Sequence, residues 1–551
     1  MDRTGCFSFV LHSHLPYLLS HGRWPHGTDW LNESLAESYL PLIDVLQRLV
    51  SEGVSPKVTI GMTPILAEQL SDPEYKVEFL QYLDQKIRHS MENEEEFRET
   101  GRSEFVPLAR VWREHYSSIK CKFLNHDGDI LGALRRLQDE GHIEVITSAA
   151  THAYLPLLRF DSSISAQIRQ GVMTYRRHFG REPMGIWLPE CGYRPGYDWS
   201  PPVISGAEGY QRRGIEEFLG EMGLKYFVVD THVLKGGKPT GTYLERFEAL
   251  KRLWGAFLKG YGAWPQRELS PYNYYLVSEV AVFTRDPVTA LQVWSGERGY
   301  PGDGWYLDFH KRHHPGGLRY WRVTSSKADL ADKQIYQPEM VKERLSENAA
   351  HFKGLVMGNL RAHLKEEGRP GIVCAPYDTE LFGHWWFEGP EWLYLVLKMM
   401  AQDPDGPRLV TLGEFLEESP PARLVSLPEG SWGEGGFHWV WLNEWNEWTW
   451  RRIYEAEEEM RGLASKYGNT EILRQAAREL LLLQSSDWQF LITTWSARDY
   501  AEKRFSDHYN RFKRLAAMAR KEALSSEDSA FLRWCYETLH PFPEIDPRWF
   551  L

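Results

Sequence analysis

The sequence predicts an α/β protein built on a parallel (β/α) barrel, with a helical insertion and a helical C-terminal domain. Short apolar runs recur through the first 413 residues, each followed by His, Asp or Glu and then by a helical pattern. That order is typical of barrels whose active site gathers at the carboxyl ends of the strands. Residues 65–138 interrupt it with a charge-rich helical block, and beyond residue 413 the apolar runs stop. We therefore expect a catalytic barrel over 1–413 and a helical domain over 414–551 that completes the cleft.

The apolar runs define the expected strands in chain order. They lie at 7–11, 58–64, 143–147, 184–189, 225–229, 281–286 and 372–375. A further strand at 290–294 is expected to pair with the run at 281–286. Because proline cannot donate to a ladder, Pro376 is expected to end the last strand.

Amphipathic periodicity defines the expected helices. They lie at 35–50 and 214–222 and, in the C-terminal domain, at 452–467, 470–484, 499–523 and 527–539. The segment 235–279 is rich in Gly, Tyr, Pro and Trp and has no regular period. Long irregular segments inside compact domains are usually functional, so we interpret this one as a lid over the cleft.

Composition narrows the class of function. The chain has 551 residues, 42% of them hydrophobic, and a net charge of −12 that argues against a nucleic-acid partner. No apolar stretch is long enough for a membrane span, and no signal peptide is recognisable. Five scattered cysteines favour a reducing, cytoplasmic location. The aromatic content is high, with 23 Trp, 27 Tyr and 25 Phe, which suggests platforms that stack on sugar rings.

Two carboxylates stand out as candidate catalytic groups. Glu190 follows the run at 184–189, and Asp378 follows the run at 372–375, so both are expected at the same barrel edge. Retaining glycosidases use two carboxyl groups about 5 Å apart, one as nucleophile and the other as acid and then base. Glu380, Asp230 and Asp286 are rivals for either role, because each also follows an apolar run.

Three histidines are the other candidate site residues. His12 and His14 end the first run and, because side chains alternate along a strand, point the same way. His152 follows the third run. Such histidines either hydrogen-bond a ligand or hold a metal ion. The second possibility predicts a metal-dependent hydrolase or deacetylase with His12, His14, His152 and Asp230 as ligands.

Several long motifs resemble those of a known family. HSHLPY (12–17), the region of His152, GIWLPECGYRPG (185–196) and APYDTELFGHWWFEGPEWL (375–393) are similar to successive motifs of glycoside hydrolase family 57. RDPVTALQVWSGERGYPGD (285–303), SWGEGGFHWVWLNEWNEW (431–448) and SSDWQFLITT (485–494) resemble that family's 1,4-α-glucan branching enzymes. The resemblance runs through nearly the whole chain in the right order.

The resemblance implies an incomplete seven-stranded (β/α) barrel with a helical insertion and an all-helical C-terminal domain. It implies that Glu190 is the nucleophile and Asp378 the general acid/base. It also implies a set of substrate-binding residues and no metal or other cofactor. These residues are His12, His14, His152, Arg285, Trp294, Gly302, Trp432, Trp441 and Asp487.

Some of these residues have alternative interpretations. Trp294, Trp432 and Trp441 could instead pack between the barrel and the C-terminal domain, and Asp487 could cap a helix. Branching enzymes of this family also carry a tyrosine over the cleft. The sequence does not single out its equivalent among Tyr243, Tyr261, Tyr272, Tyr274 and Tyr275.

The expected function is cleavage of an α-1,4 bond of an α-glucan and formation of an α-1,6 branch by a retaining mechanism. An α-amylase or a 4-α-glucanotransferase of the same family is the first alternative. A metal-dependent hydrolase and a catalytically silent glucan-binding protein are the others. The expected partner is an α-glucan, and neither a nucleic acid nor a membrane. The sequence predicts no oligomeric state.

Overall fold

Seven parallel strands form the centre of the protein in a computed structural model, which describes residues 4–23, 25–236, 265–295, 299–325 and 327–551. They follow one another in the order β10-β1-β2-β3-β4-β7-β9. Their bounds are β1 (Gly5–Ser13), β2 (Val58–Met62), β3 (Ile143–Ser148), β4 (Gly185–Trp187), β7 (Tyr226–Val229), β9 (Val280–Thr284) and β10 (Gly371–Asp378).

A single backbone bridge closes the ring of strands. Arg285, directly after β9, forms an isolated parallel bridge with Cys374 of β10. The neighbouring Asp286 amide donates to the Cys374 carbonyl at 2.9 Å. The prediction of an incomplete seven-stranded barrel is confirmed, with its seam between β9 and β10.

Four short strands among the described residues lie outside the ring. β8 (Tyr275–Val277) pairs antiparallel with β9, and β11 (Arg408–Leu409) pairs with β1. β5 (Tyr197–Trp199) and β6 (Tyr210–Arg212) form a separate antiparallel ribbon after β4.

Strand register determines which side chains meet at the carboxyl edge of the barrel. β1 is buried along nearly its whole length, as expected for a strand with neighbours on both sides and helices outside. His12 of β1 lies opposite Asp378 of β10 on one side and opposite Gly61 of β2 on the other. A Cβ at Gly61 would approach the His12 ring nitrogen Nδ1 to 3.2 Å. Glycine here leaves room for the imidazole.

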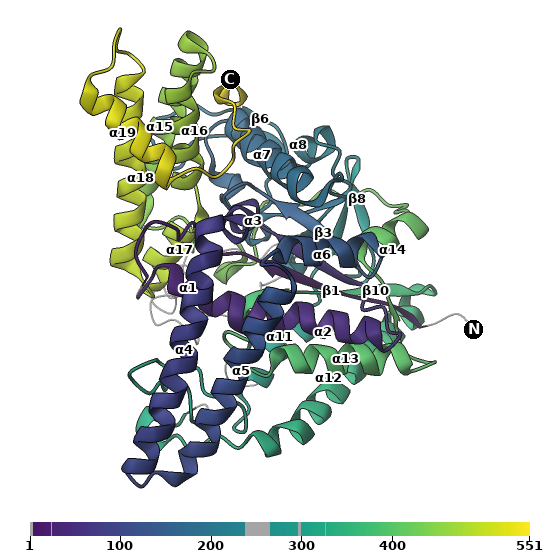
Figure 1. Ribbon diagram of the computed structural model, residues 1–551. Helices are drawn as coiled ribbons and strands as arrows, with labels where there is room; N and C mark the ends of the chain where they lie inside the picture. Colours follow the sequence, from purple (N-terminus) through teal and green to yellow (C-terminus); the bar gives the residue numbers. More distant parts are fainter. Residues whose placement is uncertain (1–3, 24, 237–264, 296–298, 326) are drawn as a thin grey trace.

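Helices cover the outside of the barrel. Residues of the expected insertion form four helices, of which α4 and α5 pack side by side and extend away from the strands (Figure 1). Other helices follow individual strands, and α12 packs against α13. Their bounds are α1 (Thr28–Ser34), α2 (Leu40–Ser51), α3 (Pro64–Ser71), α4 (Pro73–Glu99), α5 (Val106–Asn125), α6 (Ile130–Asp139), α7 (Asp161–Phe179), α8 (Ile215–Glu221), α9 (Thr231–Lys235), α11 (Pro287–Trp294), α12 (Pro338–Glu367) and α13 (Gly389–Gln402).

The C-terminal region is helical, with α15, α16 and α18 side by side at the upper left of Figure 1. α14 precedes it and packs on the barrel instead, because the Phe415 ring contacts Tyr274 and Phe283. We therefore propose that the boundary expected at residue 413 lies just after α14. The bounds are α14 (Leu412–Glu418), α15 (Glu447–Tyr467), α16 (Glu471–Leu483), α17 (Ser486–Thr494), α18 (Arg498–Met518) and α19 (Ser526–Thr538).

Two expectations about secondary structure are wrong. Residues 290–294 belong to helix α11, because Asp286 caps it by accepting from the Thr289 amide at 2.7 Å and Pro287 fills its first turn. Pro376 does not end its strand, since β10 continues to Asp378. The backbone nitrogen of Pro376 lies on the same side of β10 as the bridged backbone of Cys374, toward the seam with β9. A single bridge joins the two strands there, so the missing N–H of proline costs no ladder hydrogen bond.

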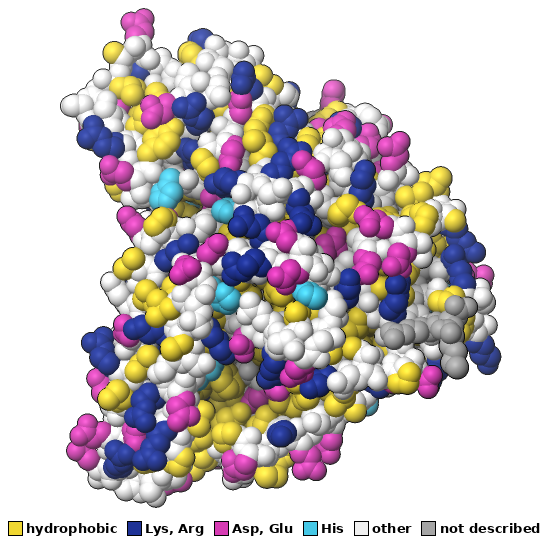
Figure 2. All heavy atoms as spheres, turned by 45° about the vertical axis from the view of Figure 1, so that its right-hand side comes forward, with side chains coloured by type: hydrophobic (Ala, Val, Ile, Leu, Met, Phe, Trp, Pro, Cys, Tyr) yellow, Lys and Arg dark blue, Asp and Glu magenta, His cyan; other side chains and the backbone are white. Residues whose placement is uncertain are grey.

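The surface is of mixed charge on the face shown in Figure 2, where Lys and Arg are interspersed with Asp and Glu. Among the described residues, no helix is both long and apolar enough to span a membrane.

Two helical glycines test how tightly the barrel is packed. At Gly171 of α7 a Cβ would lie 2.1 Å from the Ser148 carbonyl oxygen of β3, whereas at Gly354 of α12 nothing lies within 4 Å. We expect Gly171→Ala to lower the free energy of unfolding by about 1–3 kcal/mol, because helix and strand must separate. Gly354→Ala, the matched control, should raise it by about 0.5–1 kcal/mol. Denaturant midpoints compare the two, and equal midpoints would contradict the packing argument.

Candidate active site

Glu190 lies on a strained turn at the carboxyl end of β4. The turn spans Pro189–Cys191, and the φ angles of Glu190 and Cys191 are +60° and +50°. Such left-handed conformations cost non-glycine residues about 1–3 kcal/mol each and persist only where the surroundings hold them. Here the Trp432 amide donates to the Glu190 carbonyl and the Cys191 amide to the Leu188 carbonyl, both at 2.9 Å. These two hydrogen bonds hold the backbone in this conformation.

Three separate parts of the chain meet at the Glu190 carboxyl group. The Trp432 indole Nε1–H, from the loop after α14, donates to Oε2 at 2.7 Å. The Ser486 hydroxyl, at the start of α17, donates to Oε1 at 3.3 Å. His152 Nδ1 lies 3.8 Å from the same oxygen, and the Glu190 side chain retains 14% of its exposed surface. The side chain is therefore held in place, largely buried and supplied with two hydrogen-bond donors.

Asp378 lies close enough to Glu190 for their charges to interact. It is the last residue of β10 and is partly exposed. Burial raises the pKa of Glu190 to about 8, and the negative charge of Asp378 contributes to that rise against the hydrogen bond from Trp432. The structure thus brings the two predicted carboxylates into one electrostatic unit.

Of the three rival carboxylates, only Glu380 belongs to this unit. Its carboxylate accepts from the Tyr39 hydroxyl and, at 3.0 Å, from the His14 amide. Burial and then the charge of Asp378 raise its pKa to about 8. Asp286 is used as the cap of α11, and Asp230 caps α9 and lies 3.8 Å from Arg285.

The three predicted histidines form one stack beside the carboxylates. His12 Nε2 and His152 Nε2 are 3.0 Å apart, and the rings of His14 and His152 lie 3.9 Å apart between centroids. Burial, followed by the neighbouring histidine charges, lowers the pKa of both His12 and His152 well below its usual value. Both rings are therefore neutral at physiological pH and can donate or accept hydrogen bonds.

Asp487 joins the histidine stack rather than capping its helix. It lies in the first turn of α17, whose cap residue is Ser485. Its Oδ2 lies 2.9 Å from His14 Nε2 and also accepts from the Ser485 hydroxyl. Of the two interpretations of Asp487, a helix cap or a site residue, the structure favours a contact with the histidine stack.

One group among the described residues could hold a metal ion, namely His14, His152 and Asp487, with ligand atoms within 4.8 Å of one another. It differs from the predicted metal set, because Asp230 contacts Arg285 and His232 instead. Each member of the group already has a hydrogen-bond partner within the protein.

The predicted aromatic and arginine residues take different positions. Arg285 is buried, and its guanidinium lies 5.5 Å from the centre of the Trp432 ring, so it supports the tryptophan that contacts Glu190. Trp441 is buried and stacks on Tyr154 at 4.5 Å. Trp294 ends α11 and packs half-buried on the hydrophobic core, and Gly302 lies in a turn at 300–302. These last two take no part in the contacts described above.

The tyrosines expected to include a cleft-covering residue are placed only in part. Tyr243 and Tyr261 lie outside the described residues. The Tyr272 hydroxyl donates to Asp286, Tyr274 packs on Phe283, and the Tyr275 hydroxyl donates to a backbone carbonyl. The three described tyrosines therefore pack against the barrel.

Sequence reasoning did not single out three residues that the structure adds to the site. The Trp187 ring, at the end of β4, stacks on His12 at 5.0 Å and meets Trp432 edge-on at 5.0 Å. Tyr39 donates to Glu380, and Ser486 donates to Glu190. Trp187 and Ser486 are within quoted motifs, so adjacency to Glu190 and Asp487 was the available signal. Tyr39 lies in a helical stretch, and nothing in the sequence around it indicates a site residue.

Comparison with known proteins shows which family the chain belongs to. The family model of glycosyl hydrolase family 57 matches residues 8–347. The chain belongs to this family. A second model, the C-terminal region of 1,4-alpha-glucan branching enzymes, matches residues 452–550.

Among other members of family 57, a 1,4-alpha-glucan branching enzyme of Thermococcus kodakarensis is 44% identical over 98% of this chain and 78% of its own length. Its crystal structure, with glucose and additives, has a TM-score of 0.90 and covers 100% and 96% of the two chains. A branching enzyme of this family from Pyrococcus horikoshii has a TM-score of 0.89 at 42% identity, covering 99% and 97%. The alpha-amylase AmyC of Thermotoga maritima has a TM-score of 0.82 at 29% identity, covering 100% and 99%.

The indole of Trp432 provides a test of the electrostatics at Glu190. Trp432→Phe removes the donor that stabilises the ionised carboxylate, so the pKa of Glu190 should rise further above 8. Trp441→Phe is the matched control, because the Trp441 indole nitrogen has no hydrogen-bond partner among the described residues. Isotope-edited infrared titration of the carboxyl band gives both pKa values. A rise of equal size in the two variants would mean that packing, not the hydrogen bond, sets the pKa.

Proposed function

We propose that this protein is a 1,4-α-glucan branching enzyme that cleaves an α-1,4 bond and forms an α-1,6 branch by a retaining mechanism. One observation carries the proposal. The C-terminal region that matches branching enzymes (452–550) supplies Ser486 to Glu190 and Asp487 to the histidine stack. The part of the chain typical of branching enzymes is therefore built into the candidate active site.

In the first step Glu190 acts as the nucleophile. Its ionised carboxylate attacks the anomeric carbon while Asp378 transfers its proton to the departing glycosidic oxygen. The bond from C1 to that oxygen breaks, and a covalent glucosyl-enzyme remains. Trp432 and Ser486 favour this role, because their hydrogen bonds stabilise the carboxylate form of Glu190.

In the second step the 6-hydroxyl of a glucan attacks the covalent intermediate. Asp378 takes the hydroxyl proton, O6 bonds to C1, and Glu190 leaves as a carboxylate. The neutral His12 and His152 supply hydrogen-bonding groups for the donor sugar without adding charge. The Trp432 indole beside Glu190 favours a sugar ring over water at this position.

An α-amylase is the second candidate, because AmyC of Thermotoga maritima covers the whole chain at a TM-score of 0.82. The two activities share the first step and differ in whether water or a sugar completes the second. The partner in either case is an α-glucan. The five unpaired cysteines support our proposal that the enzyme works in a reducing cytoplasm.

The product of amylose tests the proposal directly. We expect proton NMR of the incubated polymer to show new α-1,6 linkages, and Glu190→Gln to lower the rate by on the order of 10³-fold or more. Formation of reducing ends alone would identify an amylase, and longer linear chains a 4-α-glucanotransferase. Loss of activity with a chelator would favour the metal-dependent alternative. Tight amylose binding without turnover would identify a glucan-binding protein.

The pH dependence follows from the interaction of the two carboxylates. Catalysis requires that the pair holds one proton, and burial with mutual repulsion keeps that proton bound until about pH 8. We expect kcat/KM to fall as pH rises through about 8, where the pair loses its last proton. A second fall is expected on the acidic side, where both groups are protonated. An alkaline limb below pH 6 would contradict the assignment of these two residues.

A further inference from the structure

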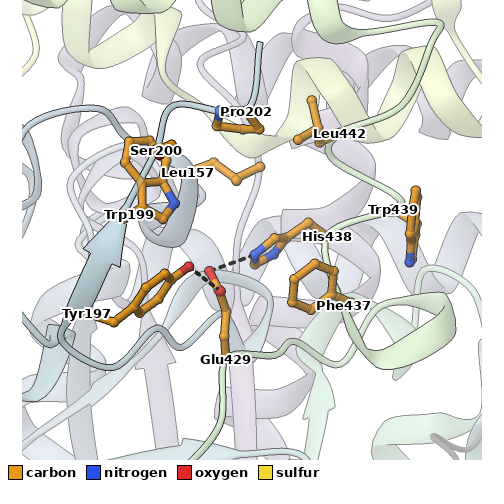
Figure 3. A pocket seen from close by; sticks show the side chains of 10 residues that line it. All are labelled: Leu157, Tyr197, Trp199, Ser200, Pro202, Glu429, Phe437, His438, Trp439 and Leu442. Atoms are coloured by element: carbon orange, nitrogen blue, oxygen red, sulfur yellow. Dashed lines mark hydrogen bonds and ion pairs between the residues drawn. The ribbon is translucent and has the colours of Figure 1, made fainter. Parts of the chain in front are cut away.

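A pocket separate from the residues around Glu190 is lined in part by the loop that carries Trp432. It has a volume of about 380 Å³, within the range of about 300–1,000 Å³ found for small-ligand sites. Its walls come from the β5 ribbon and from the loop after α14 (Figure 3). Its aromatic and charged lining residues are Tyr197, Trp199, Glu429, Phe437, His438 and Trp439. None of the residues that contact Glu190 is among those that line it.

The polar floor of the pocket is a buried carboxylate with two donors. Glu429 accepts from the Tyr197 hydroxyl at 2.7 Å and from His438 Nε2 at 2.8 Å (Figure 3). Burial opposes its ionisation, but these hydrogen bonds and the charge of His438 keep the pKa of Glu429 below its usual value. An ionised carboxylate therefore lies among aromatic rings, where it can accept hydrogen bonds from a ligand with hydroxyl groups.

The aromatic rings differ in exposure. Trp199 is buried, while 41% of the Trp439 surface is exposed. Tyr197 and Phe437 are half-buried between them. Flat aromatic faces next to a hydrogen-bond acceptor suit a ligand with apolar C–H faces and polar edges, as a pyranose ring has. A purely apolar ligand would leave the Glu429 carboxylate without compensation for lost water.

The loop 429–442 connects this pocket to the catalytic group. Gly430, next to Glu429, exchanges two backbone hydrogen bonds with Tyr193, just beyond the Glu190 turn. His438 Nδ1 lies 2.8 Å from the Tyr154 hydroxyl, and the Tyr154 ring stacks on Trp441. A glucan held in the pocket would therefore contact the same loop that positions Glu190.

We propose that the pocket is a second α-glucan site, which binds sugar units remote from the bond being cleaved. Only the identity of the ligand rests on the proposed function. A site of this kind raises the affinity for a long chain that reaches both places, because the second contact becomes intramolecular. Short oligosaccharides that fill only the positions next to Glu190 gain nothing from it.

The test compares two tryptophans of equal exposure. Trp439→Ala removes the exposed wall of the pocket, and Trp534→Ala removes an indole that is also 41% exposed but lies on α19. We expect Trp439→Ala to raise the KM for amylose about tenfold relative to the KM for p-nitrophenyl α-maltoside. Trp439→Phe should restore most of the loss, and Trp534→Ala should change neither constant.

A binding measurement separates failure of this inference from failure of the proposed function. Maltoheptaose is titrated calorimetrically into Glu190→Gln with and without Trp439→Ala. Two binding events in Glu190→Gln and only one in the double variant would support the pocket, even if the unmodified enzyme forms no branches. Turnover of amylose by an enzyme whose Trp439→Ala and Trp534→Ala variants behave alike would overturn the pocket and leave the branching proposal standing.

Discussion

The hydrogen bond from the Trp432 indole to Glu190 connects the two halves of this protein at the point where chemistry is proposed. Glu190 lies in the turn after the fourth barrel strand, and Trp432 comes from the loop that leads into the C-terminal helices. The same loop binds the Glu190 backbone, and α17 adds Ser486 from a third direction. Glu190 keeps its left-handed backbone conformation because the Trp432 indole, the loop backbone and Ser486 all hold it there. The C-terminal helices are thus part of the site and not an appendage to the barrel.

Burial also gives the carboxyl groups of the site a high affinity for protons. Glu190 and Glu380 flank Asp378, and the pKa of each is raised to about 8 by burial and by that shared neighbour. The opposite effect acts on His12 and His152, whose charged forms are disfavoured by the same burial. At neutral pH the site therefore contains neutral imidazoles and at least one protonated carboxyl group. Transfer between two sugars needs this combination, since an acid and a nucleophile must be present together.

Much of this arrangement was predictable from the sequence, because an apolar run followed by an acid or a histidine is a local pattern. The seven strands, Glu190, Asp378 and the three histidines were found in that way. What failed depended on contacts between distant segments. Pro376 remains in its strand because of the seam beside it, and Tyr39 reaches Glu380 across more than 300 residues of chain. The helix at 287–294 has local signals, Asp286 and Pro287, but its apolar residues resemble those of a strand.

The single bridge between Arg285 and Cys374 bears on how the enzyme could diversify. The chain between β9 and β10 is the longest connection between consecutive barrel strands. An insertion or deletion in it shifts one strand relative to the other, which a full ladder would resist at every rung. A seam with one backbone bridge tolerates such shifts between β9 and β10, and β10 keeps its register through its complete pairing with β1. This connection can therefore vary in length while Asp378 stays in register with His12.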